Sequence, residues 1–209
     1  MTPQEFTELL KLGHEVRGVE FKGPSVCSDK PFRARVIRSL LAMANHRGGG
    51  RTIIGVSEVD SRPCAAGLSP EEVLTWNHDD LTSAVSEYAD PYLSLRTEQL
   101  VYEGKSFIVI HVDEFDQIPV LCRREYQDVL RKGACYVRRL GKPESSEIPT
   151  AAEMRDLIEL ATEKGLRRFF HLAHAAGLEI ARRPDTEAGD TEAGDTDEER
   201  FRLQRERNR

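Results

Sequence analysis

The residues best suited to chemistry are two glutamates and a lysine near the N-terminus. Glu20 and Lys22 stand two positions apart where polar and apolar residues alternate, and Glu15 precedes Glu20 by five residues. In a β-strand, a two-residue spacing places both side chains on one face. A carboxylate beside an ammonium group suits phosphodiester cleavage, because the carboxylate can hold a divalent cation while the lysine positions or deprotonates water and neutralises developing charge. Alone, the same pattern also fits a surface salt bridge.

A third carboxylate, Glu58, is predicted to lie just past the end of a buried, β-branched strand over residues 52–56. Mg²⁺ and Mn²⁺ take oxygen ligands and keep several waters, so an acid delivered by a second strand is what such a site requires. Asp60 is a nearby substitute, and an ordinary loop acid is the alternative interpretation. The expected metal ligands are Glu15, Glu20 and Glu58, with Mg²⁺ or Mn²⁺ as the cofactor.

The net charge of −6 is distributed unevenly. Residues 184–209 contain nine acidic and five basic side chains, a net charge of −4, which leaves −2 for residues 1–183. Two stretches, 17–51 and 122–142, are rich in lysine and arginine and are predicted to attract phosphate, although ordinary solvated charges explain them equally well. The candidate nucleic-acid-binding residues in these stretches are Arg33, Arg35, Arg38, Arg47, Arg138 and Arg139.

Composition indicates a polar globular protein of the cytoplasm. The N-terminal residues lack the pattern of a signal peptide, and no apolar run approaches the roughly 18 residues of a membrane helix, so no membrane partner is expected. The four cysteines match no zinc spacing and are expected to be free thiols.

Hydrophobic periodicity and turn residues predict an α+β fold, a mixed β-sheet flanked by helices. The predicted helices begin at capping boxes starting at residues 2, 69 and 150, with a further helix over 32–46 and a break near 77. Strands are predicted over 17–22, 52–56, 93–101, 105–112 and 134–138. The ordered domain is predicted to cover 1–180, and the acidic, repetitive residues 181–209 form a largely disordered tail.

Glycines 48–50 separate the second predicted helix from the strand that follows. A phosphate-binding loop requires the opposite order, strand, glycines, helix, so that the helix N-terminus faces the anion. This segment is therefore predicted to be a tight helix-to-strand turn.

The arrangement of these motifs resembles the Schlafen-type AlbA domain. The resemblance is carried by Glu15-x4-Glu20-Phe21-Lys22, by the helix end Ala42-x-Ala44-Asn45-x-x-Gly48-Gly49, and by Ile53-Ile54-Gly55-Val56-x-Glu58 followed by Gly67. Further along, residues 135–141 and 151–154 are similar to the family's later segments. The resemblance spans about 13–155 and implies a Schlafen AlbA-like core.

The resemblance also implies an activity. The family includes endoribonucleases that cut tRNA and rRNA with three carboxylates and a divalent metal, and these positions correspond to Glu15, Glu20 and Glu58, with Lys22 at the lysine of the motif. The third position is usually aspartate in the nucleases. Many bacterial members are described only as DNA-binding or ATP-binding regulators, and vertebrate members pair two lobes around RNA, which suggests a homodimer here.

The leading hypothesis is a metal-dependent endoribonuclease that cleaves structured RNA such as tRNA, with RNA favoured over DNA. The alternatives are a non-catalytic nucleic-acid-binding or regulatory module, and a protein-interaction component of a larger, defence-related assembly. Metal-dependent cleavage that is lost in Glu20→Ala would distinguish the endoribonuclease from the non-catalytic binding module. Absence of any affinity for nucleic acid would indicate the protein-interaction component.

Overall fold

The computed structural model describes residues 1–140 and 142–178, so the tail predicted over 181–209 lies outside the described residues. The chain divides into two units, Met1–His171 and Leu172–Arg209. The helices are α1 Pro3–Lys11, α2 Lys30–Ala44, α3 Pro70–Thr75, α4 His78–Ser86 and α5 Ala151–Ala175. The strands are β1 Val19–Lys22, β2 Gly50–Ile54, β3 Val56–Val59, β4 Arg62–Ala65, β5 Ala89–Asp90, β6 Leu95–Tyr102, β7 Lys105–Val112, β8 Leu121–Cys122, β9 Tyr136–Arg138 and β10 Ser145–Glu147.

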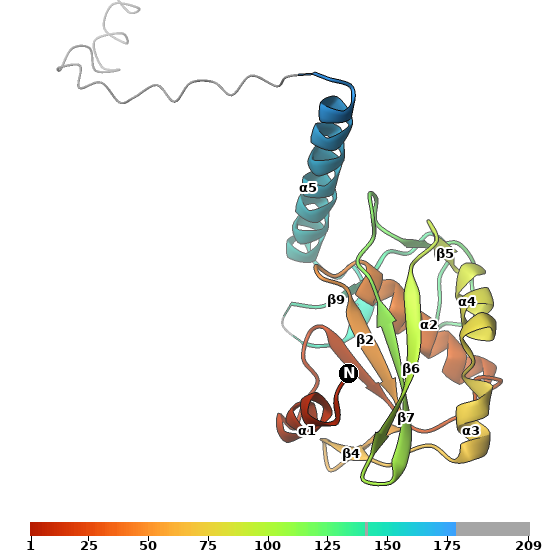
Figure 1. The fold of residues 1–209 in the computed structure, drawn as a ribbon. Helices are drawn as coiled ribbons and strands as arrows, with labels where there is room; N and C mark the ends of the chain where they lie inside the picture. The colour runs from red at the N-terminus through yellow and green to blue at the C-terminus, as the bar shows by residue number, and fades with distance from the viewer. Residues whose placement is uncertain (141, 179–209) are drawn as a thin grey trace, which may run out of the picture. The chain divides into compact units, whose positions relative to one another are not determined.

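The main sheet has four strands in the order β1-β2-β7-β6. Strands β1 and β2 are parallel and are joined through α2, whereas β2, β7 and β6 pair antiparallel (Figure 1). The predicted α+β fold with a mixed sheet is confirmed. Three two-stranded ladders accompany the sheet, β3 with β4, β5 with β8, and β9 with β10.

Local sequence signals set the helix ends. The capping boxes at Thr2 and Ser69 both form, and Asn77 caps α4 at the predicted break in the second helical segment. In the second unit, Gly177 follows the end of α5 and has the left-handed conformation. The Leu178 amide donates a hydrogen bond to the Ala173 carbonyl, so a carbonyl of the last helical turn has a partner.

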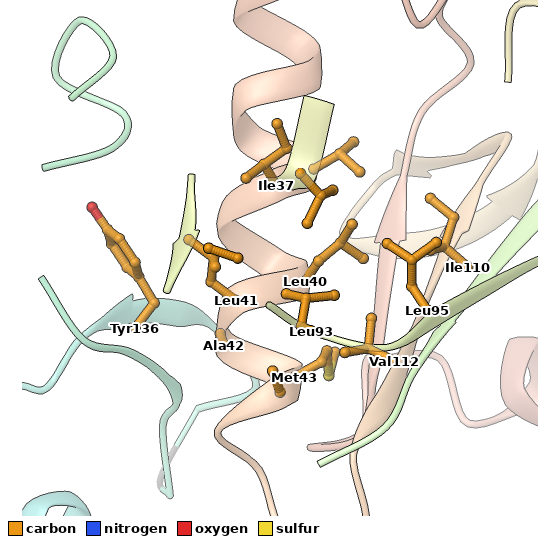
Figure 2. Packing of buried hydrophobic residues seen from close by; sticks show 14 of the residues in the cluster. Ile37, Leu40, Leu41, Ala42, Met43, Leu93, Leu95, Ile110, Val112 and Tyr136 are labelled. Atoms are coloured by element: carbon orange, nitrogen blue, oxygen red, sulfur yellow. The ribbon is translucent and has the colours of Figure 1, made fainter. Parts of the chain in front are cut away.

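Helix α2 is buried on more than one side, which explains why its apolar residues form such a broad face. Figure 2 shows Leu40 and Met43 directed toward Leu95 and Val112 of the sheet, with Leu41 on the side of Tyr136. These side chains belong to one core cluster of buried residues. The helix therefore packs between the main sheet and the β9–β10 ladder.

A second, smaller core lies on the opposite face of the sheet. Phe6 of α1 is fully buried, with its ring centroid 4.9 Å from that of Phe107 and 5.1 Å from that of Tyr102. Ile53 and Val109 belong to this core, so alternate residues of β2 and β7 face the two clusters. Helix α1 is thereby fixed against the sheet.

The predicted strand over 52–56 ends earlier than expected. Gly55 has φ +106°, and an added Cβ would stand 2.9 Å from the Phe107 ring, so the backbone turns here and a second strand, β3, follows. Glu58 consequently lies within β3, paired with Pro63 of β4, and not just past a strand end. Its side chain is exposed.

Within the described residues, no helix is long and apolar enough to cross a membrane. Cys27, Cys64, Cys122 and Cys135 are free, as predicted.

Candidate functional site

The most highly connected polar group of the fold is the guanidinium of Arg138 in β9. Its side chain is 0% exposed. It donates from Nη1 to Glu20 Oε2 at 2.6 Å, from Nη2 to the Val19 carbonyl at 2.9 Å, and from Nε to the Arg17 carbonyl at 3.0 Å. Longer contacts reach Ser145 Oγ, Glu15 Oε2 and the Val16 carbonyl. We call Arg138, Glu15, Glu20, Lys22 and Ser145 the Arg138 cluster.

All four carboxylate oxygens of Glu15 and Glu20 are hydrogen-bonded, three of them to members of this cluster. Glu20 bonds to Arg138 and Ser145 through Oε2 and to Lys22 through Oε1. Glu15 accepts the Phe21 amide at Oε1 at 2.6 Å and contacts Arg138 through Oε2. A buried charge is tolerated only when it is paired and hydrogen-bonded, and this cluster meets that requirement.

Burial raises the pKa of the Glu15 carboxyl, and the neighbouring Glu20 acts in the same direction, against the Phe21 amide and the Arg138 charge. The carboxylate is thus held in a partly dehydrated position where its negative charge is costly.

The same contacts determine whether a divalent metal fits. Among the residues that the structure describes, no group of three or more His, Cys, Asp or Glu side chains is placed to hold a metal ion. One oxygen of Glu15 and one of Glu20 contact the cationic Arg138, and Glu58 lies on a separate hairpin. In this arrangement the three carboxylates do not form a ligand set for Mg²⁺ or Mn²⁺.

An open pocket of about 450 Å³ nevertheless brings several of the predicted residues together. It is lined by Glu15, Lys22 and Glu58, together with Arg35 of α2 and Lys142. We call it the Lys22 pocket. Its cations come from β1, from α2 and from the segment before β10, which meet only in the folded chain.

The motif around Asn45 has a structural role. The buried side-chain amide donates to the Val120 carbonyl at 2.8 Å and to the Tyr136 carbonyl at 2.9 Å, and its oxygen accepts the Val120 amide at 2.8 Å. These bonds tie the end of α2 to β9 and to the segment that precedes β8. The side chain of Arg138 is oriented by the strand that Asn45 anchors.

The family model for "Schlafen, AlbA_2" matches residues 15–145. The chain belongs to the Schlafen AlbA_2 family. The matched span begins at Glu15 and ends at Ser145, so it includes every member of the Arg138 cluster. The family is one of nucleic-acid-associated domains, which agrees with the family resemblance of the sequence motifs.

Two solved structures are similar to this AlbA_2 chain. The crystal structure of the DIP2311 protein from Corynebacterium diphtheriae has 16% identity and a TM-score of 0.46, and the match covers 67% of this chain and 23% of that one. The solution structure of the N-terminal domain of a RecG-related protein from Nitrosomonas europaea has 20% identity and a TM-score of 0.49, covering 72% and 96%. No curated protein matches the chain.

The six arginines predicted to bind nucleic acid do not form one track on this AlbA_2 domain. Arg138 is buried in its cluster, so its guanidinium is not presented at the surface in this arrangement. Arg35 lines the Lys22 pocket, Arg38 lines a different pocket with Glu144, and Arg47 pairs with Glu163 at 2.6 Å. The remaining two, Arg33 and Arg139, are half-buried.

Sequence reasoning missed two residues of the site, Lys142 and Ser145. Lys142 lies in the basic stretch 122–142, which could have suggested it. Ser145 belongs to a three-residue strand that has no periodic pattern, so no local signal marks its bond to Glu20.

Proposed function

We propose that this AlbA_2 domain binds nucleic acid, with structured RNA such as tRNA favoured over DNA, through the Lys22 pocket. The observation that carries the proposal is the convergence of Lys22, Arg35 and Lys142 on one open pocket. Three cations against the two carboxylates Glu15 and Glu58 leave the pocket with a net positive charge. Lysine and arginine that neutralise phosphates supply most of the sequence-independent affinity for nucleic acid.

The cations of the pocket differ in their freedom to bind a phosphate. Lys22 is held by Glu20 in the Arg138 cluster, so it serves as a fixed charge on the pocket wall. The Arg35 guanidinium stands over the Phe32 ring, 5.6 Å from its centroid, and is exposed to solvent. Lys142 is exposed and pairs with Glu144 at the surface. Arg35 and Lys142 are therefore the residues to test.

The experiment is fluorescence anisotropy with labelled tRNA, single-stranded RNA and duplex DNA across a salt series. We expect the Arg35→Ala/Lys142→Ala variant to bind at least tenfold more weakly and its log–log salt slope to fall by about 2, since each lost phosphate contact removes about 0.9. The matched control is Arg124→Ala/Lys132→Ala, which removes two exposed charges from another surface. Equal losses in both variants, or none in the first, refute the role of the pocket.

Metal-dependent endonuclease activity is the second candidate. The observation that favours it is that Glu15, Lys22 and Glu58 line the same pocket. Holding a cation there would require Glu15 and Glu20 to give up Arg138 as their partner. Glu58→Ala is the preferred test because Glu58 is exposed and has no part in the Arg138 cluster. Cleavage of tRNA that depends on Mn²⁺ and disappears in Glu58→Ala supports this candidate, and cleavage that is equal in both proteins rejects the site.

A homodimer is the proposed assembly, formed by pairing of α5 with α5 of a second copy. Met154, Ile158, Gly165 and Phe169 share one helix face by their spacing of four, seven and four residues, and all are exposed. Glycine inside a helix costs about 0.5–1 kcal/mol relative to alanine. A Cβ added at Gly165 meets nothing within 4 Å, so close approach by a second helix would explain its presence.

Charge supports an antiparallel arrangement of the two helices. The first half of α5 is acidic, with Glu153, Asp156, Glu159 and Glu163 against a single arginine, whereas the second half contains Lys164, Arg167 and Arg168. Antiparallel pairing places the acidic half of one helix beside the basic half of the other.

Analytical ultracentrifugation tests the dimer. We expect wild type to sediment as a dimer and Ile158→Glu/Phe169→Glu as a monomer. The control, Leu74→Glu/Val101→Glu, places the same charges at leucine and valine side chains that are also more than half exposed, on α3 and β6. A monomeric wild type, or dissociation by both variants, contradicts the proposal.

A further inference from the structure

A row of basic side chains crosses the sheet near the start of β2, the end of β7 and the start of β6. Arg51 of β2 is paired in register with His111 of β7, and His111 is paired with Arg96 of β6. Cross-strand partners project from the same face of a sheet. The row therefore presents two guanidinium groups on either side of an imidazole, and we call it the arginine row.

The arginine row lies on the face opposite α2. Arg51 is two residues from Ile53, and His111 is two residues from Val109, and both apolar residues belong to the α1-side core. Thr52, between them, is bonded to Ser39 of α2 instead. Helix α1 covers the part of this face around Phe107, whereas the arginine row lines an open pocket of about 370 Å³.

The two arginines are available to a ligand. Neither the Arg51 nor the Arg96 side chain has a hydrogen bond or ion pair to another described residue, whereas Arg47, which lines the same pocket, is paired with Glu163. His111 Nε2 bonds to Glu98 Oε1 at 2.8 Å, which holds the imidazole between them. Neighbouring strands are about 4.8 Å apart, so the Cα atoms of Arg51 and Arg96 are about 10 Å apart and two long side chains can reach one anion between them.

The glycine turn forms the end wall of this pocket. A Cβ at Gly49 would stand 2.1 Å from the Val112 carbonyl oxygen, and one at Gly50 would stand 2.2 Å from Met43 Sδ, so neither position tolerates a side chain. Two of the backbone amides are already used, Gly48 by Glu114 at 2.7 Å and Gly49 by the His46 carbonyl at 2.8 Å. An anion here is bound by side chains rather than by a backbone nest.

We propose that the arginine row is a second phosphate-binding site, which takes the phosphodiester backbone of a nucleic acid on the sheet face opposite α2. Arginine is the side chain best matched to phosphate, because its planar fork donates two parallel hydrogen bonds. Arg47 and Asp113 also line the pocket, and Arg47 is already paired with Glu163, so the positive charge offered to an anion is that of Arg51 and Arg96. The proposal rests on the proposed nucleic-acid binding and adds a contact surface separate from the Lys22 pocket.

The first test uses an inorganic probe. Tripolyphosphate is titrated into the full chain while the His111 imidazole is followed by NMR. We expect a saturable shift in wild type, an affinity at least tenfold lower in Arg51→Ala/Arg96→Ala, and no change in the control Arg62→Ala/Arg124→Ala. Partial recovery in Arg51→Lys/Arg96→Lys shows that charge at the row is responsible. Absence of a shift in wild type, or equal affinity in the alanine variants, overturns the proposed anion site.

The second test uses tRNA and separates this proposal from the proposed function. We expect Arg51→Ala/Arg96→Ala to lower the log–log salt slope of tRNA binding by about 2. If only Arg35→Ala/Lys142→Ala weakens binding, the arginine row is not a nucleic-acid site, while the proposed function stands. If wild type binds no nucleic acid, the proposed function fails, and this proposal fails with it even where tripolyphosphate binds.

Discussion

Removing the guanidinium of Arg138 gives the sharpest test of the cluster. Arg138→Met keeps most of the side-chain volume but deletes every donor. Glu20 then loses its 2.6 Å partner, and the carbonyls of Arg17 and Val19 lose bonds of 3.0 and 2.9 Å. Breaking a buried ion pair by removing one partner costs about 3–5 kcal/mol, because the other charge stays buried and uncompensated.

The measurement is urea unfolding followed by fluorescence of Trp76, which is 3% exposed and donates its indole N–H to the Ser25 carbonyl. We expect the unfolding free energy of Arg138→Met to fall by about 4 kcal/mol. For a domain of this size, that corresponds to a decrease in Tm of roughly 8–16 °C. The m-value is expected to stay constant, since the variant exposes no additional surface on unfolding.

Two further variants identify the cause. Arg124→Met removes an exposed arginine whose one ion-pair partner among the described residues is Glu87, and we expect a change below about 1 kcal/mol. Glu20→Gln combined with Arg138→Met removes both members of the closest buried ion pair, so the double variant should be more stable than the sum of the single effects implies. If Arg138→Met costs no more than Arg124→Met, the cluster does not stabilise the fold and the reasoning is refuted.

Four other variants test the framework around the site. Asn45→Ala removes three buried hydrogen bonds at once and should lower the unfolding free energy by about 2–3 kcal/mol in urea titrations. Gly48→Ala meets no atom within 4 Å and should cost about 1 kcal/mol for its positive φ, whereas Gly49→Ala drives a Cβ into the Val112 carbonyl and should prevent folding, as circular dichroism would show. The raised pKa of Glu15 makes its ionised form unfavourable in the folded state, so wild type loses stability relative to Glu15→Gln as pH rises through the folded pKa. Below the ordinary pKa of glutamate, Glu15 is protonated in both the folded and the unfolded state, so the difference in unfolding free energy between wild type and Glu15→Gln should vanish. Unfolding free energies that change identically with pH up to pH 8 in the two proteins would contradict this prediction.

Local signals in the sequence predicted much of the secondary structure. Thr2 and Ser69 with their partner glutamates, and Asn77 at the break, specify helix starts through contacts within one turn, so they could be recognised without a fold. The strand predicted over 52–56 is present but begins earlier, at Gly50, and ends earlier, at Ile54. Its end depends on Gly55 meeting the Phe107 ring, a contact across 52 residues.

The candidate site was harder to predict. The strand spacing of Glu20 and Lys22 correctly predicted that their side chains meet. The same spacing could not show that Arg138, 118 residues later in the chain, pairs with the Glu20 carboxylate. From the sequence, Arg138 looked like one more basic residue of a phosphate-binding stretch, because its charge is visible in the sequence and its burial is not.

The amino-acid sequence by itself determined the α+β elements, the family motifs and the distribution of charge, because periodicity, caps and composition act over a few residues. Only the tertiary structure decided what those charges do. It buried Arg138 against Glu15 and Glu20, brought Arg35 and Lys142 to Lys22, and aligned Arg51 with Arg96 across β7. Each of these outcomes depends on packing between segments that are distant in the sequence. A buried charge is stable only when it is paired within the protein, whereas a surface charge is solvated and can bind a ligand.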